Sequence, residues 1–309
     1  MRNIFIFIFL SLFFASCSSG FFDQVVNIDP PEYQKQLVVY GFSGTLDSNF
    51  RAQVSRNVGL LDNVKDSAFY VKNAKVELYE DSQLKLSAPQ SSLKQNGWYE
   101  TFTGPGIYKA GKTYELRVSH PELPTATAQQ IMPNPVSVDS VRIREKAGID
   151  NDGTALYSID VFLHDKPGEK NYYGIKVTTT DFYTSPIFDQ NGILIGYDTI
   201  QIGEQRVFPY ASDDPNAELG DDMLVVSDQF FDGQAYKFSF KSDYYNQSAT
   251  YNVRVRAITE DQYLYAVSLQ RQLDAEDFPL SEPVVVHNNV KNGIGVFCLY
   301  NEQLFTIHK

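Results

Sequence analysis

Apolar and polar side chains alternate in short runs along the chain from residue 36 onward. A period of two residues places successive side chains on opposite faces of a strand, so each run predicts a half-buried β-strand. Clusters of Gly, Asn and Asp separate the runs, as tight turns require. In the first part of the chain the expected strands cover residues 37–40, 51–56, 75–79, 98–102, 113–119 and 125–132. A series of about seven short strands predicts an immunoglobulin-like or transthyretin-like β-sandwich over residues 36–132.

Two prolines, Pro133 and Pro135, interrupt this pattern. Because they disfavour helix and break strand pairing, we expect a domain boundary here. A second β-rich domain is expected over residues 136–309. Within it, residues 136–144 and 155–164 form an expected antiparallel pair across a turn at residues 150–153. Further strands are expected at residues 172–180, 192–197, 235–241, 251–258, 283–287 and 295–300.

One segment has the signature of a helix. Thr259 followed by Gln262 fits a capping box, in which Thr is the N-cap and Gln is the third helical residue. Apolar residues then recur at helical spacing, and Pro279 prevents continuation. The sequence therefore predicts a mainly β protein: an N-terminal sandwich, then a second β-rich domain with one short helix near residues 260–274.

The N-terminus has the layout of a secretory signal peptide over residues 1–16. Arg2 precedes an apolar run, residues 4–14, that is shorter than the roughly 20 apolar residues of a membrane-spanning helix. Small residues then precede Cys17, which is the lipobox pattern of bacterial lipoproteins, and we expect Cys17 to be lipidated. The alternative is an ordinary signal peptide with a chance cysteine. Residues 17–35 would form the lipidated N-terminus and a tether to the folded part.

Cysteine content and charge exclude several classes of protein. The chain has two cysteines, and acylation of Cys17 would leave Cys298 without an intramolecular partner, so a disulfide scaffold is excluded. The net charge is −12, and loss of Arg2 with the signal makes it more negative. This balance argues against nucleic acids and anionic membrane surfaces as partners.

Several segments together resemble a family of Bacteroidota lipoproteins catalogued as domain of unknown function 4249. The resemblance is carried, in this order, by the lipobox at Cys17 and by residues 37–41, 106–108, 111–118, 133–141 and 289–297. It implies a lipoprotein anchored in the outer membrane, of a kind often encoded beside TonB-dependent transporters. It carries no known catalytic residues, and it leaves open whether the protein faces the medium or the periplasm.

One acidic segment is a candidate cation site. Five carboxylates fall within ten residues of an expected loop: Asp213, Asp214, Glu218, Asp221 and Asp222. A bound Ca²⁺ could relieve their mutual repulsion. A solvated acidic loop that binds no metal is the alternative, and a pair of these carboxylates could also serve a hydrolase.

Other candidate motifs are incomplete. Residues 41–44 lack the spacing of a nucleophile elbow and are expected to form a turn after the first strand. The four histidines have no second His or Cys at metal-ligand spacing. Asp150 begins a run that resembles a calcium loop, but position 12 is Val161 instead of Glu, so a hairpin turn is expected.

Aromatic residues and the second cysteine complete the candidates. Most aromatic side chains, including Trp98, are expected to fill strand faces. Residues 183–188 and 229–233 lie near expected loops and are candidate interface segments. Cys298 is expected to be a buried thiol that packs as a small apolar group.

Three functions remain after these exclusions. We expect a non-catalytic binding or accessory module, without a cofactor, associated with a TonB-dependent nutrient transporter. The alternatives are a surface protein that binds glycans or peptides directly and, third, a hydrolase that uses residues 213–222. The first predicts an exposed apolar patch, the second an exposed row of Tyr or Trp, and the third carboxylates that converge in a pocket.

Overall fold

A computed structural model describes the protein at residues 33–59, 65, 68–90, 100–106, 108–201, 203–207, 214–220, 223–243, 250–276 and 281–308. The chain divides into two compact units, residues 1–34 with 59–63 and residues 35–58 with 64–309. All the strands and helices given below belong to the second unit. Among the described residues, no helix is both long enough and apolar enough to cross a membrane.

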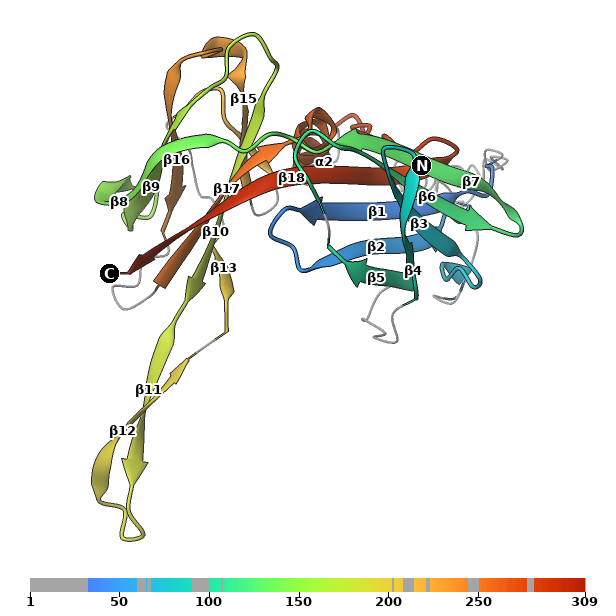
Figure 1. The fold of residues 1–309 in the computed structure, drawn as a ribbon. Coiled ribbons are helices and arrows are strands. Elements are labelled where there is room, and N and C mark those ends of the chain that lie inside the picture. The colour runs from blue at the N-terminus through green and yellow to red at the C-terminus, as the bar shows by residue number, and fades with distance from the viewer. Residues whose placement is uncertain are drawn as a thin grey trace, which may run out of the picture. The chain divides into compact units, whose positions relative to one another are not determined.

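A nine-stranded sheet forms the centre of this unit (Figure 1). Its strands, in spatial order, are β14 (Glu218–Gly220), β15 (Met223–Ser227), β10 (Tyr172–Thr180), β17 (Thr250–Ile258), β18 (Gly293–His308), β1 (Leu37–Gly44), β2 (Asn49–Arg56) and β5 (Glu100–Pro105), with β13 (Gln205–Val207) also paired to β10. The strands are antiparallel except for β1 and β18, which run parallel. The prediction of a mainly β fold is confirmed.

Two smaller sheets and a hairpin complete the strands. The four-stranded sheet has the order β4 (Gln83–Ala88), β3 (Lys75–Glu80), β6 (Thr113–His120) and β7 (Leu123–Ile131). The three-stranded sheet has the order β16 (Ala235–Ser242), β9 (Ala155–His164) and β8 (Ser137–Ile149). The hairpin consists of β11 (Phe182–Phe188) and β12 (Leu194–Gln201). Within the described residues the helices are η3 (Asp228–Phe230) and α2 (Glu260–Glu276).

The nine-stranded sheet contributes to two hydrophobic cores. The first core contains buried residues of β1, β2 and the four-stranded sheet, such as Val39 and Leu116. The second contains residues of β10, β17 and the three-stranded sheet, such as Ile175 and Phe240. Two sheets that bury facing apolar side chains form a β-sandwich, so the chain builds two sandwiches on one shared sheet.

Strand β18 belongs to both sandwiches. Its first half pairs with β1 and buries Phe297 and Leu299 in the first core. Its second half pairs with β17 and places Phe305 and Ile307 against the second core. The sequence assigned all residues after 136 to a second domain, whereas residues 293–300 complete the first sandwich.

Alternation along β18 also defines a second face of the sheet. Odd-numbered side chains such as Phe297 point to the cores, and Tyr300 on the opposite face packs with Val267 of α2. Met223 and Ile258 join the same cluster from neighbouring strands. We call this side of the nine-stranded sheet the helix face.

The expected helix is present, but its capping differs from the prediction. Helix α2 begins at Glu260, close to the expected start. However, Thr259 Oγ1 and Gln262 Oε1 are buried and make no hydrogen bond within the described part of the chain, so the capping box does not form. The Gln262 side chain instead lies against the helix face of the sheet, where it lines a pocket.

Two sequence predictions are wrong for local reasons. Residues 283–287 form no strand, because their backbone donors bond to side chains: Val284 N to Gln272 Oε1 and His287 N to Ser268 Oγ, at 2.8 and 2.9 Å. Residues 41–44 are the end of β1 instead of a turn, and Ser43 is fully buried there. The predicted pairing of β8 with β9 is confirmed.

Candidate functional site

The hairpin β11–β12 is specified by its turn. The Asp189 carboxylate accepts hydrogen bonds from the backbone N–H groups of Asn191 and Ile193, both at 2.8 Å. The bond from Ile193 is the main cause that holds the pKa of Asp189 below its ordinary value. Gly192 has a φ of 78°, a conformation that glycine adopts without strain. This short turn reverses the chain at the outer end of the hairpin and joins β11 to β12.

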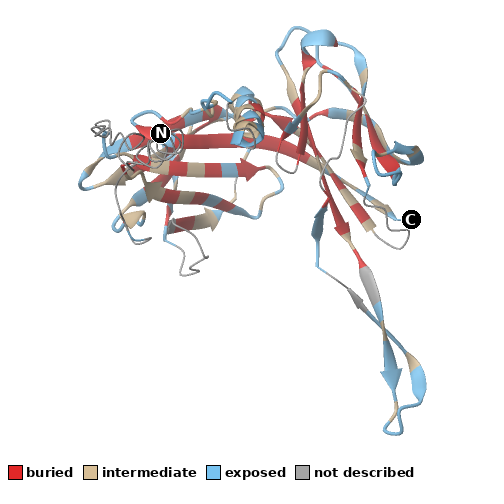
Figure 2. Ribbon diagram, turned by 180° about the vertical axis from the view of Figure 1, so that it is seen from behind, coloured by how far each residue is buried: buried red, intermediate tan, exposed pale blue. Residues whose placement is uncertain are grey.

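The two strands of the hairpin pair only with each other among the described strands. In Figure 2 the outer part of this hairpin is coloured mostly as exposed residues. Six large apolar residues here are 42–65% exposed: Ile187, Phe188, Ile193, Leu194, Ile195 and Tyr197. They lie on both sides of the turn at the hairpin's outer end.

A hairpin with so many exposed apolar side chains is unusual on a protein surface. A two-stranded hairpin alone is marginally stable in water, and large exposed apolar patches mark interaction sites. Residues 182–201 contain two acidic residues, Asp189 and Asp198, and no Lys or Arg. The hairpin therefore offers an apolar surface with a small negative charge and two open strand edges. Predicted interface residues 183–188 lie within it.

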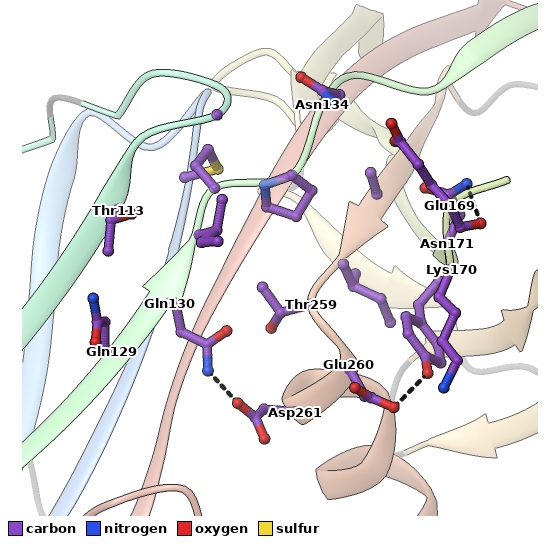
Figure 3. Close-up of a pocket in the computed structure, with 17 residues that line it drawn as sticks. Thr113, Gln129, Gln130, Asn134, Glu169, Lys170, Asn171, Thr259, Glu260 and Asp261 are labelled. Atoms are coloured by element: carbon purple, nitrogen blue, oxygen red, sulfur yellow. Dashed lines mark hydrogen bonds between the residues drawn. The ribbon is translucent and has the colours of Figure 1, made fainter. Parts of the chain in front are cut away.

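A polar pocket lies at the N-terminus of α2 (Figure 3). Its volume is about 700 Å³, within the usual range for ligand sites. Amide and carboxylate side chains from β7, from residues 133–134, from residues 169–171 before β10 and from α2 line it, and Figure 3 labels Gln129, Asn134 and Glu169 among them. Tyr172 donates a hydrogen bond to Glu260 at 2.7 Å. The pocket can offer many hydrogen bonds to a polar ligand.

Asp261, at the edge of this pocket, holds three segments together. Its carboxylate lies 2.6 Å from His287 Nε2 and 3.0 Å from Asn289 Nδ2, and it also accepts a hydrogen bond from Gln130. Burial raises the pKa of Asp261, but the hydrogen bonds outweigh burial and leave the pKa below its ordinary value. Because all three partners are already bonded to this carboxylate, we interpret the group as structural.

A second group of carboxylates lies beside η3. Oxygen atoms of Asp165, Asp228 and Asp232 lie within 4.8 Å of one another, a spacing that a divalent cation could bridge. Burial, together with the neighbouring charges of Asp165 and Asp232, raises the pKa of Asp228. Backbone N–H groups already donate to each carboxylate, such as Asn171 N to Asp228 at 2.7 Å. Asp232 comes from the predicted interface segment 229–233.

The predicted acidic site is only partly within the described structure. Cys17, Asp213, Asp221 and Asp222 lie outside the described residues. Asp214 accepts hydrogen bonds from Asn216 N, at 2.9 Å, and from Tyr236. Glu218 accepts one from Arg271 of α2 at 3.1 Å. These two carboxylates are therefore directed at different protein partners.

The remaining candidate residues have structural partners. The four histidines bond to four different groups: His120 to Lys72 O, His164 to Asp139, His287 to Asp261 and His308 to Thr250. The Asp150 carboxylate accepts two backbone N–H groups of its own turn. Cys298 is fully buried, and burial raises the pKa of its thiol well above the ordinary value. Trp98 lies outside the described residues.

The family model for a domain of unknown function, DUF4249, matches residues 23–305. The chain belongs to this family. The matched residues include both sandwiches, the β11–β12 hairpin and α2. A search of the curated proteins finds no match. Among solved structures, the chain is similar to the FN1–FN3 domains of chicken CNTN1, at 10% identity and a TM-score of 0.23, over 92% of this chain and 68% of that one.

Sequence reasoning missed two parts of this DUF4249 chain. It identified residues 183–188 as a candidate interface segment, whereas for residues 192–197 it predicted a strand and no interface. It also missed the Asp261 group, since Gln130 and Asp261 are 131 positions apart. A three-residue apolar run directly after an Asn-Gly turn is the signal that could have identified the hairpin.

Proposed function

We propose that the protein is a non-catalytic binding module of the cell envelope, which engages a protein partner through the β11–β12 hairpin. In this proposal a lipid on Cys17 anchors the chain in the outer membrane, and residues 18–35 tether the sandwiches to it. The partner we propose is an outer-membrane transporter of the TonB-dependent class, as the family resemblance in the sequence implies.

The exposed apolar end of the hairpin carries this proposal. Its six large apolar residues cover neither hydrophobic core, so the fold itself does not require them. Full burial of one such side chain against a partner would contribute about 1.5–3 kcal/mol to the binding free energy. A partner strand could also satisfy an open edge of β11 or β12, as in β-strand addition.

The chemistry of the hairpin favours a protein over the alternatives. Its turn is polar, with Asp189 and Asn191, and the hairpin carries no Lys or Arg to contact anionic lipid. A glycan platform would need a row of exposed aromatic rings. Among the residues whose exposure is described, the exposed aromatic side chains are Tyr33, Phe42, Tyr70, Phe188, Tyr197 and Phe230. Only Phe188 and Tyr197 belong to one hairpin, and two rings do not form a row.

Site-specific photo-crosslinking in intact cells tests this proposal. A photoreactive residue at Ile195 of the full-length protein is expected to crosslink to an outer-membrane barrel protein, identified by mass spectrometry. The matched control is Leu84 on β4, which is 54% exposed against 64% for Ile195. Crosslinks of the same barrel from both positions, or from neither, would contradict the proposal.

A variant pair gives an independent measurement. Phe188→Ser with Ile195→Ser is expected to abolish co-purification of the barrel from detergent-solubilised outer membranes, while Leu84→Ser leaves it unchanged. The anchor is tested separately by mass spectrometry of the mature N-terminus. Diacylglycerol on the Cys17 thiol is expected, and an unmodified thiol there would overturn the membrane part of the proposal without affecting the hairpin.

A further inference from the structure

A groove on the helix face of the nine-stranded sheet collects positive charge. It consists of two adjacent pockets of about 640 and 420 Å³, which share Lys176, Arg206 and Arg256 in their linings. Arg51 lines the first pocket and Arg254 the second. We call these five cationic residues and the space between them the basic groove.

Strand alternation explains why these residues meet. Lys176 lies between Ile175 and Val177, both of which face the second core, so its own side chain points to the opposite face. Arg254 and Arg256 alternate in the same way with core residues of β17. Arg51 comes from β2, on the far side of β18 and β1. Residues more than 200 positions apart in sequence thus share one sheet face.

Among the described residues that line the groove, cationic side chains outnumber acidic ones. Glu302 bonds to Arg254 and Arg256, at 3.3 and 2.6 Å, and Glu204 bonds to Arg254 at 2.8 Å. Arg51 has no ion pair with any described residue. Among the residues that the structure describes, Asp47 is the third acidic residue in the lining, against five cationic ones, of which Lys176 and Arg206 also interact with other groups of the protein. A local excess of positive charge on a chain of net charge −12 attracts anions to this place.

Aromatic rings form the wall between the groove and α2. Tyr265 of α2 packs against Phe42 of β1, with ring centroids 5.7 Å apart. The Arg256 guanidinium lies 4.0 Å from the centroid of the Tyr300 ring. Aromatic faces beside guanidinium groups favour a ligand that has both an apolar face and an anionic group.

One buried polar group in the groove has no protein partner. Gln262 lines the first pocket and is 3% exposed, yet its Oε1 makes no hydrogen bond within the described part of the chain. An unsatisfied buried acceptor costs about 1–3 kcal/mol. A hydroxyl donor from a ligand would satisfy it. A ligand that has both a hydroxyl group and an anionic group could therefore bond to Gln262 and to the cationic side chains at the same time.

We propose that the basic groove binds a hydroxylated organic anion, such as a sugar acid or a sugar phosphate. The arginine and lysine side chains bind the carboxylate or phosphate, Gln262 accepts a hydrogen bond from a hydroxyl group, and the rings of Phe42 and Tyr265 contact the carbon face. This site is separate from the hairpin and does not depend on the proposed partner.

Calorimetric titration of the detergent-solubilised, lipid-anchored protein tests the proposal. Comparison of glucuronate with glucose 6-phosphate shows whether the groove prefers a carboxylate or a phosphate. Glucose, which has no charge, shows whether binding requires an anionic group. We expect at least one anion to bind at low salt at least about tenfold more tightly than glucose, and more weakly as salt is added. Equal affinity for glucose, or no binding of either anion at about 10 mM, would overturn the proposal.

Two sets of variants locate the binding. Arg51→Gln with Arg206→Gln is expected to weaken anion binding at least about tenfold, whereas Arg142→Gln, an exposed arginine on β8, is expected to have no effect. Gln262→Leu is expected to weaken binding while the melting temperature stays the same or rises, because an unsatisfied acceptor is removed. Unchanged affinity in either groove variant would contradict the proposal.

Discussion

Asp261 Oδ1 lies 2.6 Å from His287 Nε2 and so joins the first turn of α2 to a segment without regular secondary structure. The same carboxylate bonds to Gln130 of β7. One side chain therefore fixes the helix, the four-stranded sheet and the approach to β18. This arrangement makes part of the stability of the fold depend on the ionisation of the Asp261 carboxyl group.

Asp261→Asn is expected to lower the free energy of unfolding at pH 7 by about 1–3 kcal/mol, because charged hydrogen bonds become neutral ones. The folded-state pKa of Asp261 lies below its unfolded value. Its contribution is therefore present above pH about 4 and is lost as the pH falls through the folded-state pKa. Urea unfolding of the variant and of the original protein at pH 7 and pH 3 measures this contribution. A difference in the free energy of unfolding that is equal at both pH values would contradict the prediction.

Asp228→Asn is expected to raise the free energy of unfolding at pH 7, the opposite of the effect of Asp261→Asn. Burial and the charges of Asp165 and Asp232 raise the pKa of Asp228, so ionisation destabilises the folded state above the unfolded pKa. The neutral variant should gain stability at pH 7 and lose that gain as the pH falls toward 4. Thermal unfolding at both pH values checks the sign, with Asp152→Asn in an exposed turn as the control.

The shared sheet predicts cooperative unfolding of the two sandwiches. Phe297→Ala empties space in the first core and is expected to cost about 3–5 kcal/mol. Because β18 continues into the second sandwich, both cores should still unfold in one transition at a lower denaturant concentration. Hydrogen exchange of β3 in the first sandwich and β9 in the second measures this. Retention of the protection of β9 after loss of that of β3 would show that the cores are independent.

The buried thiol of Cys298 is expected to be unreactive in the folded protein. Burial raises its pKa, so little thiolate forms at neutral pH, and reagents have no access. In a Cys17→Ser chain, a thiol reagent should label no site until denaturant is added. Rapid labelling without denaturant would mean that β18 opens readily.

The hairpin is expected to be dispensable for folding. Phe188→Ser with Ile195→Ser should change the free energy of unfolding by less than about 0.5 kcal/mol, since neither side chain packs in a core. The variant should also bind less of an apolar fluorescent dye. A large loss of stability would show that the hairpin supports the second sandwich.

Local patterns predicted many of the strands and the helix, but they did not predict β4, β11 or β15, nor the pairing of strands that are distant in the sequence. Alternation located β1, β9 and β17, and the polar first turn located α2. The strand expected at residues 283–287 failed because Pro283 has no N–H and nearby donors bond to side chains. The parallel pairing of Leu37 with Gly293 could not be predicted, since no local signal links positions so far apart.

The candidate sites differ in the same way: one lies within a short segment, and the other is built from distant strands. The interface prediction for residues 183–188 came from the aromatic content of one short segment. Such content can be read directly from the sequence. The basic groove joins Arg51 of β2 to Lys176 of β10, with three strands between them in the sheet. Only the order of strands brings these charges together, and single-sequence patterns do not contain that order.

The position of β18 has a consequence for how the protein is made. This strand follows all the other described strands in the sequence, so the ribosome produces it after them. Until it emerges, the edges of β1 and β17 that it will cover stay open, and neither interior is closed to water. We therefore expect a growing chain to stay loosely structured until β18 is available to pair with both β1 and β17.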